Sequence, residues 1–192
     1  MPERLPQDRL IDQFQAPTSP PLPREQLIAD LLRVEKAARY RPPANDFQQL
    51  LGTWQLRFVT GTQKARQRAG IVLGAGQYLP SWVKITLTYE AATDNTGRMI
   101  NRISLAPLTL VVSGPCRFQS PRNLLVFDFT RLAITLGRLT LFQGFLGNGE
   151  EREAQFSQRE IGKQAFFVFF LLEERVIAAR GKGGGLALWV KP

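Results

Sequence analysis

Side chains that could carry covalent or acid–base chemistry are scarce in this sequence. Its 192 residues contain no histidine and a single cysteine, Cys116. A Ser-His-Asp or Cys-His nucleophile system and an imidazole proton shuttle therefore cannot be built, and zinc or histidine-ligated iron is not expected. Cys116 follows Gly114 and Pro115 near a predicted strand end, which favours a small, semi-buried residue over a reactive thiol. A lone cysteine forms no intramolecular disulfide, so nothing indicates an oxidising compartment.

Two short clusters have the composition of functional loops. Residues 180–185 read Arg-Gly-Lys-Gly-Gly-Gly, which has the composition of a phosphate-binding loop. A Walker loop, however, ends in Gly-Lys-Ser/Thr and opens a helix, whereas a strand is predicted to follow here. A tight turn or bulge is therefore favoured. Arg180 is expected to lie over the ring of Trp54 as a cation–π pair. Glu150, Glu151 and Glu153 are interpreted as a solvated run rather than an acid–base pair. We therefore predict a protein that is not an enzyme and needs no cofactor.

The elements that position these side chains are mostly strands. From Gly52 onward the apolar residues recur with period two, which indicates strands. In 53–60 one face carries Trp54, Leu56 and Phe58, and the turn signal at 94–97 predicts a hairpin. Eight to ten short strands follow from the pattern, at about 53–60, 83–90, 99–105, 108–113, 124–130, 132–136, 139–142, 166–172, 175–179 and 186–190.

One helix precedes the strands, over 24–38, with Leu27, Ile28, Leu31 and Leu32 on one stripe. Residues 1–22 hold five prolines and are expected to form an extended tail, leaving 23–192 as a single helix-plus-barrel domain. The alternative for the tail is one short amphipathic turn with Leu10, Ile11 and Phe14, docked on the barrel or on a membrane. Evenly spaced strands without intervening helices favour an antiparallel barrel or a sandwich. A meander of about eight strands would close around side chains or one small ligand.

Charge and aromatic content suggest partners. The net charge of +9 attracts anionic partners or only aids solubility; without a dense Lys/Arg block, nucleic acid is not the expected partner. The insert at 61–82 is a lid or binding loop, an Ω-loop or an extra packed helix, and its Lys64, Arg66 and Arg68 are expected to contact anionic lipid head groups. The longest apolar run, 165–172, is too short to span a bilayer.

The 13 phenylalanines form either a packed core or an apolar cavity for an isoprenoid or acyl chain. Both interpretations remain open at this point. The predicted ligand-binding residues are those expected on inward strand faces: Trp54, Phe58, Leu87, Tyr89, Phe127, Phe129, Phe167, Phe169 and Trp189.

Several short motifs together resemble the plastid lipid-associated proteins, or fibrillins, in their cyanobacterial form. They are Leu-Gly-Thr-Trp-Gln-Leu at 51–56, Gln-Tyr-Leu-Pro at 77–80, and Arg180-Gly181 before the Gly-Gly-Leu-Ala-Leu run at 184–188. The residues that we assign to the family motif are Gly52, Trp54, Arg180 and Gly181. The resemblance covers about 27–190, but Ile177 stands where the family often has a first arginine.

The resemblance implies a lipocalin-like antiparallel β-barrel, mainly β, that binds or transports a lipophilic small molecule such as a carotenoid, quinone or acyl lipid. It also implies a cytoplasmic protein, peripheral to thylakoids or lipid bodies, with a protective role. The alternative is a structural membrane- or lipid-particle-associated protein whose barrel is filled and which acts through its basic surface. A nucleic-acid binder and an enzyme rank below these two.

Overall fold

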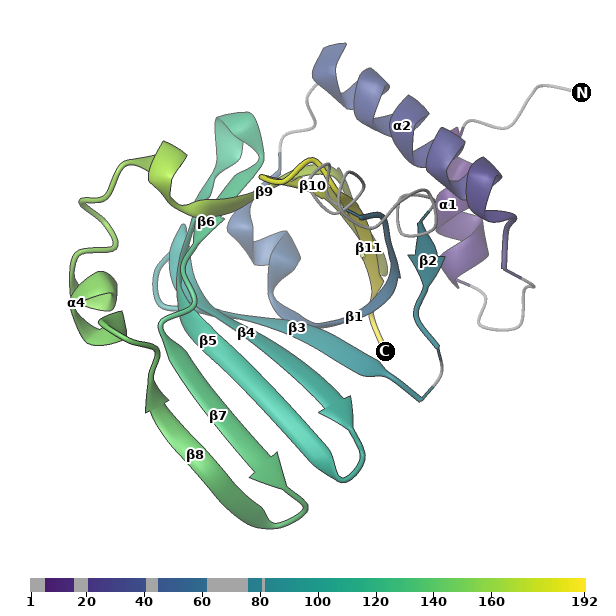
Figure 1. The fold of residues 1–192 in the computed structure, drawn as a ribbon. Coiled ribbons are helices and arrows are strands. Elements are labelled where there is room, and N and C mark those ends of the chain that lie inside the picture. Colours follow the sequence, from purple (N-terminus) through teal and green to yellow (C-terminus); the bar gives the residue numbers. More distant parts are fainter. Residues whose placement is uncertain (1–5, 16–20, 41–44, 62–75, 81) are drawn as a thin grey trace, which may run out of the picture.

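The computed structural model describes residues 6–15, 21–40, 45–61, 76–80 and 82–192 (Figure 1). Its helices are α1 (Pro6–Gln15), α2 (Arg24–Tyr40), η1 (Phe47–Leu50), η2 (Ser120–Arg122), α4 (Gly149–Ala154) and η3 (Ile161–Lys163). Its strands are β1 (Gly52–Val59), β2 (Gln77–Tyr78), β3 (Lys84–Ala91), β4 (Thr96–Leu105), β5 (Leu108–Gln119), β6 (Leu124–Phe127), β7 (Arg131–Leu136), β8 (Leu139–Phe145), β9 (Ala165–Leu172), β10 (Val176–Gly181) and β11 (Leu186–Val190).

Eight of these strands close into a barrel. Around the ring the order is β1, β3, β4, β5, β6, β9, β10 and β11, and β11 returns to β1; every pairing is antiparallel. Each strand therefore lies beside its neighbour in the chain, apart from the inserted β2, β7 and β8. The predicted mainly-β fold, an antiparallel barrel with a leading helix, is confirmed, and the sandwich is not the architecture.

The β5 strand is longer than the sequence pattern predicted. Gly114-Pro115 was expected to end it, yet β5 runs on to Gln119. Its first half pairs with β7 and its second half with β6, so the proline falls where the partner changes and its missing N–H interrupts neither ladder. A Cβ atom at Gly114 would overlap the backbone carbonyl oxygen of Asp128, which explains the glycine beside this junction.

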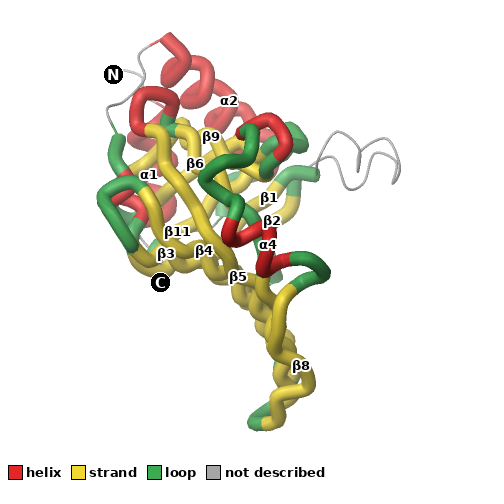
Figure 2. The backbone as a smooth tube through the Cα atoms, turned by 90° about the vertical axis from the view of Figure 1, so that its left-hand side faces the viewer, coloured by secondary structure: helices red, strands yellow, loops and turns green. Residues whose placement is uncertain are grey.

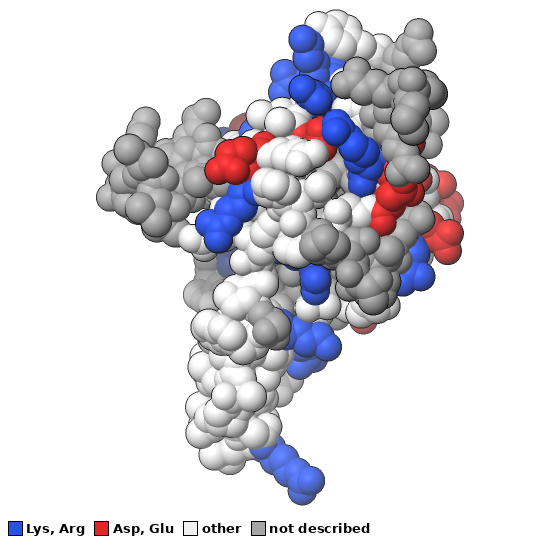
Figure 3. Space-filling view, turned by 90° about the vertical axis from the view of Figure 1, so that its right-hand side faces the viewer, with Lys and Arg blue, Asp and Glu red and all other residues white. Residues whose placement is uncertain are grey.

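The change of partner produces a projection from the barrel. The hairpin of β7 and β8 continues the sheet from the first half of β5, which also pairs with the last residues of β4. We call residues 101–112 and 131–145 the β-wing. Figures 1 and 2 show this single layer of strands extending beyond the barrel, and in Figure 3 the lower projection is mostly uncharged, with basic side chains at its tip and edge and no acidic ones.

Both long helices pack on the outside of the barrel (Figure 1). The expected extended tail is wrong for 6–15, which form α1. Leu10 of α1 is fully buried with Leu27 and Leu31 of α2 against the outer face of the barrel strands. The α1 helix begins at Pro6, a position that needs no backbone N–H, and Arg9 reaches Asp30 of α2 at 2.9 Å. Apolar burial against the barrel therefore outweighs the low helix propensity of a proline-rich segment.

A short helix closes one end of the barrel. The side chain of Asp46 accepts from the backbone N–H of Gln49 while the Gln49 side chain accepts from the backbone N–H of Asp46, forming a capping box that starts η1. Phe47 and Leu50 of η1 are fully buried in the barrel core. The chain then enters β1 through Gly52, whose φ of 101° suits glycine.

Candidate ligand-binding cavity

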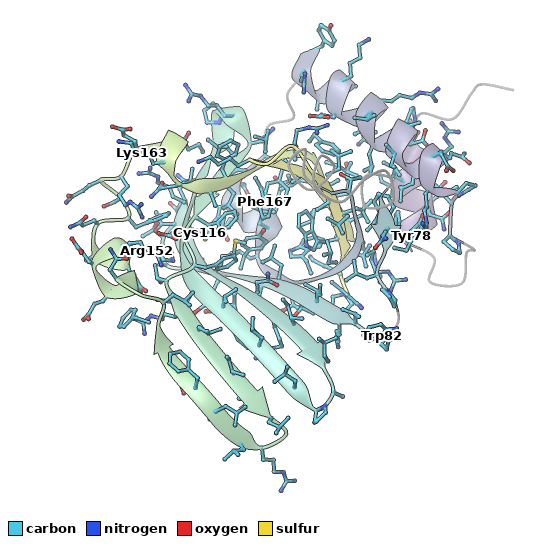
Figure 4. All side chains as sticks on the ribbon, in the orientation of Figure 1. Tyr78, Trp82, Cys116, Arg152, Lys163 and Phe167 are labelled. Carbon is cyan, nitrogen blue, oxygen red and sulfur yellow. The ribbon has the colours of Figure 1, made fainter. Side chains whose placement is uncertain are left out.

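The barrel interior holds a continuous apolar cluster. All of the predicted ligand-binding residues except Phe58 belong to it or pack against it. Figure 4 shows Phe167 directed into the barrel and Cys116 on its wall. The predicted residues placed there are Trp54, Leu87, Tyr89, Phe127, Phe129, Phe167, Phe169 and Trp189.

The prediction that Phe58 faces the interior is wrong. The register of β1 against β11 shifts between Leu56 and Phe58. Such a bulge places two consecutive residues opposite one, so the alternation of faces is reset. Phe58 is fully buried in the outer cluster beneath the helices, and its ring lies 5.1 Å from that of Tyr78.

A cavity of about 250 Å³ opens at one end of the barrel. It is walled by aliphatic, aromatic and glycine residues with two neutral polar side chains, and none of its lining residues is ionisable. The lining comprises Leu56, Val59, Thr60, Ile85, Leu87, Met99, Asn101, Phe129, Phe167, Gly181, Gly183, Gly185, Leu186, Ala187 and Trp189. Such a chamber suits an apolar molecule and offers no side chain for acid–base chemistry.

One polar atom in this wall lacks a partner. The Oδ1 atom of Asn101 is buried and accepts no hydrogen bond from the described residues. A buried carbonyl oxygen without a donor costs about 1–3 kcal/mol, and a ligand hydroxyl or N–H would relieve this cost. The opposite wall is aromatic, with the rings of Phe167 and Trp189 5.4 Å apart.

Beyond this cavity the interior holds large buried side chains. Trp54 and Tyr89 are buried and lie outside the cavity wall, with Phe127 and Phe169; Trp54 Nε1 donates to the carbonyl of Leu50 at 2.7 Å. The predicted residues that do line the cavity are Leu87, Phe129, Phe167 and Trp189. Ile85 shares the strand face of Leu87 and could have been predicted from that alternation, whereas nothing in the sequence distinguished Asn101.

Arg180 has a different partner from the one expected. Its guanidinium forms two bonds with the carboxylate of Glu35 on α2, at 2.7 and 2.5 Å, and a third with the carbonyl of Gly184. The predicted stacking on Trp54 is wrong; Lys191 Nζ lies over that ring, 5.1 Å from its centroid. Arg180 therefore ties α2 to the β10–β11 turn, which Gly181 closes by donating to Gly185.

The Glu35 carboxylate stays ionised despite its position. Burial raises its pKa, but hydrogen bonds from Arg180 and Arg39 and their charges outweigh burial, so the pKa lies below the ordinary value. The side chains of Glu35, Arg39 and Arg180 also line a second cavity beside α2, of about 270 Å³. A cavity of about 400 Å³ lies between the helices and β9, with Arg33 and Glu173 in its wall. Both lie at the seam between the helices and the barrel and not inside it.

Two further predictions concern reactive groups. Cys116 is buried, and burial raises the pKa of its thiol to about 12, which confirms the unreactive interpretation. The acidic run of Glu150, Glu151 and Glu153 was interpreted as solvated; these residues lie in α4, and Glu153 is not merely solvated. Burial raises the pKa of Glu153, but bonds from Arg131, Thr130 and Arg98 lower it to about 2.

Some predicted features fall outside the described residues. Lys64, Arg66 and Arg68 lie in 62–75, so their expected contact with lipid head groups stays a prediction. In the part of the chain that the structure describes, no group of three or more histidine, cysteine or acidic side chains could hold a metal ion. Within the same residues, no helix is both long and apolar enough to cross a membrane.

Comparison with known proteins identifies no family. No family model matches the chain, and no curated protein matches it. Similar solved structures include the redesigned β-barrel b11L5F_LGL (10% identity, TM-score 0.38, covering 76% of this chain and 93% of that one). A second is EF1p2_mFAP2b bound to DFHBI (14% identity, TM-score 0.34, covering 76% of this chain and 95% of that one). A third is the redesigned β-barrel mFAP1 bound to DFHBI (10% identity, TM-score 0.31, covering 76% of this chain and 96% of that one). At these TM-scores the likenesses carry no argument about function, and the resemblance to fibrillins stays a prediction.

Proposed function

We propose that this protein binds a lipophilic small molecule at the open end of its barrel and catalyses no reaction on it. The observation that carries the proposal is the apolar cavity whose wall includes the amide oxygen of Asn101, which accepts no hydrogen bond from the described residues. The aromatic wall of Phe129, Phe167 and Trp189 would contact the apolar body of the ligand. The Asn101 oxygen would accept a hydrogen bond from its polar end.

The cavity size limits what it encloses. Pockets for small molecules usually measure about 300–1,000 Å³, and this one is about 250 Å³. It therefore fits one end of a long lipophile, and the remainder would extend through the mouth. A quinol, a hydroxylated carotenoid ring or the hydroxyl end of an acyl lipid meets both requirements.

The cellular setting belongs to the same proposal. A cytoplasmic protein, peripheral to thylakoids or lipid bodies and with a protective role, is supported by the resemblance to fibrillins alone. The motif residues Trp54 and Arg180 have clear structural roles here, in the barrel core and in the tie to α2. These roles explain why the motif residues are needed for the fold, and the identity of the ligand has to be determined by experiment.

Tryptophan fluorescence tests the binding proposal. Trp189 lines the cavity, whereas Trp82 is 72% exposed and not part of its wall. Titration with a plastoquinol, a hydroxylated carotenoid and a fatty alcohol should give saturable quenching by at least one of them. The Trp189→Phe variant should lose most of the quenching and Trp82→Phe should keep it. Quenching that survives in Trp189→Phe places the ligand elsewhere.

Replacing Asn101 with leucine tests the polar contact. The variant should weaken binding of the hydroxylated ligand about fivefold, the effect of one neutral hydrogen bond, and should not weaken binding of the matching hydrocarbon. The rival function, a structural protein with a filled barrel, is favoured by the burial of the large side chains of Trp54 and Tyr89 in the barrel interior. Absence of quenching by every lipophile would support that rival.

A further inference from the structure

The β-wing has one apolar face and one polar face. Side chains of directly paired residues lie on the same side of a sheet. Near the end of the wing the pairing runs from Leu105 through Leu108 and Leu136 to Leu139. Four leucines from four strands therefore share one face, and they are 38%, 39%, 44% and 63% exposed in that order.

A second apolar row lies closer to the barrel on the same face. It runs from Ile103 through Leu110 and Ile134 to Phe142, and Phe142 is 45% exposed. We call the side that carries these two rows the apolar wing face.

The opposite face is polar at the same level. There the pairing runs from Ser104 through Thr109 and Thr135 to Thr140. The period of two thus separates leucine from threonine across a single layer of strands, and the described residues include nothing that covers the leucines. A single layer with one apolar side needs an apolar neighbour, because isolated sheets gain their stability from burying that side.

The apolar wing face is continuous with the cavity wall. Leu87 and Asn101 line the cavity and pair with each other. Asn101 also pairs with Val112, which pairs with Leu132 of the wing. Whatever covers the apolar wing face therefore lies at the mouth of the barrel.

Charge identifies the neighbour. Acidic residues are absent from 98–127 and from 129–149, whereas these stretches include Arg102 and Arg138. Arg138 lies in the turn between β7 and β8, beside the leucine row, and forms no ion pair with a described residue. Arg102 and Lys84 lie on the opposite, polar face, since Lys84 pairs with Ser104 and Arg102 pairs with Val111. An apolar face with no acidic residue on its strands and an unpaired cation at its tip matches the surface of an anionic bilayer.

We propose that the apolar wing face is a docking surface for an anionic lipid bilayer, with the barrel mouth turned toward the lipid. The wing lies flat at the interface and does not insert upright, because the outer edge of β8 ends the sheet and an open edge is not tolerated in hydrocarbon. Trp82, 72% exposed just before β3 (Figure 4), is of the type that settles at a membrane interface.

Sedimentation with vesicles tests this docking without any added ligand, so its outcome is independent of the proposed lipophile binding. The full chain is mixed with vesicles of equal parts phosphatidylcholine and phosphatidylglycerol. Replacing Leu139 and Phe142 together with asparagine should lower the partition coefficient on the order of tenfold or more. The matched control, asparagine at Thr135 and Thr140 on the opposite face, should change it less than about twofold.

Two further comparisons test the role of charge and the possibility of self-association. Arg138→Gln should weaken binding to the anionic vesicles about fivefold and should leave the weaker binding to pure phosphatidylcholine unchanged. The single variant Leu139→Asn, at a mostly exposed position, replaces the double variant if circular dichroism shows that the latter is unfolded. Equal partition of wild type and the leucine variants overturns the proposal, as does failure of the wild type to bind. A dimer that those variants dissociate, without vesicle binding, assigns the face to a second copy instead.

Discussion

Replacing Arg180 with methionine removes the guanidinium that joins α2 to the barrel wall. The side chains of the pair are 28% exposed for Arg180 and 10% for Glu35, and the variant leaves the carboxylate with Arg39 alone, at 3.0 Å. Loss of one partner of a fully buried ion pair costs about 3–5 kcal/mol. Because this pair is partly solvated and Arg39 remains, we expect the free energy of unfolding to fall by about 2 kcal/mol.

A double-mutant cycle with Glu35→Gln isolates the interaction. Urea denaturation at neutral pH should give a coupling energy of about 1–2 kcal/mol between the two positions. Arg39→Met is the control, because an exposed pair four residues apart on a helix contributes about 0.3–0.5 kcal/mol. Additivity of Glu35→Gln and Arg180→Met would refute the assignment of Arg180 as the tie between helix and barrel.

The pH dependence of the same variant has a defined sign. The pKa of Glu35 is lower in the folded state than its ordinary value of 4.5. A depressed carboxyl pKa stabilises the fold above the unfolded pKa, and this stabilisation is lost as the pH falls through the folded value. The difference between wild type and Arg180→Met should therefore be largest at neutral pH and should shrink in acid. A difference that stays constant from neutral pH to acid would contradict this account.

Three further perturbations have expected outcomes. The pKa of Glu153 is about 2 in the folded protein, against an ordinary value of 4.5. Its ion pairs should therefore add about 1–2 kcal/mol to the free energy of unfolding above pH 5, after a reduction for its partial solvation. Glu153→Gln should remove the part of the acid destabilisation that occurs between about pH 4.5 and 2, and an unchanged acid profile would contradict this. Leu10→Ala, at a fully buried site, should lower the free energy of unfolding by about 2–3 kcal/mol, whereas no loss in thermal denaturation would mean that α1 is not docked. Cys116, with a pKa of about 12, should resist a maleimide at pH 8 in the folded protein and react in urea, and rapid labelling of the native protein would show that the barrel opens.

Strand positions were predictable because they depend on local alternation. The turn at 94–97 and the alternation of 83–90 correctly predicted the hairpin of β3 and β4. The meander order followed because short turns force successive strands to be neighbours. The same locality failed at Gly114-Pro115, where a strand continues across a proline because its pairing partner changes there.

The candidate site was predictable in part for the same reason. Leu87, Phe129, Phe167 and Trp189 alternate inward and reach the cavity. Phe58 alternates inward in the sequence and is turned outward by a bulge, which depends on the register against β11, a strand far away in the chain. The choice between a filled and a hollow barrel depends on how side chains from opposite walls meet, and local pattern does not specify that.

The sequence by itself determined the class of fold and the absence of histidine or disulfide chemistry, because composition and period-two alternation are local properties. Tertiary structure alone decided the partner of Arg180, the burial of α1 and the unpaired oxygen of Asn101. It also decided that Leu136 of β7 and Leu139 of β8 lie on one open face of the β-wing. These features arise from contacts between residues distant in the chain, such as Glu35 and Arg180, and such contacts exist only once the barrel has closed.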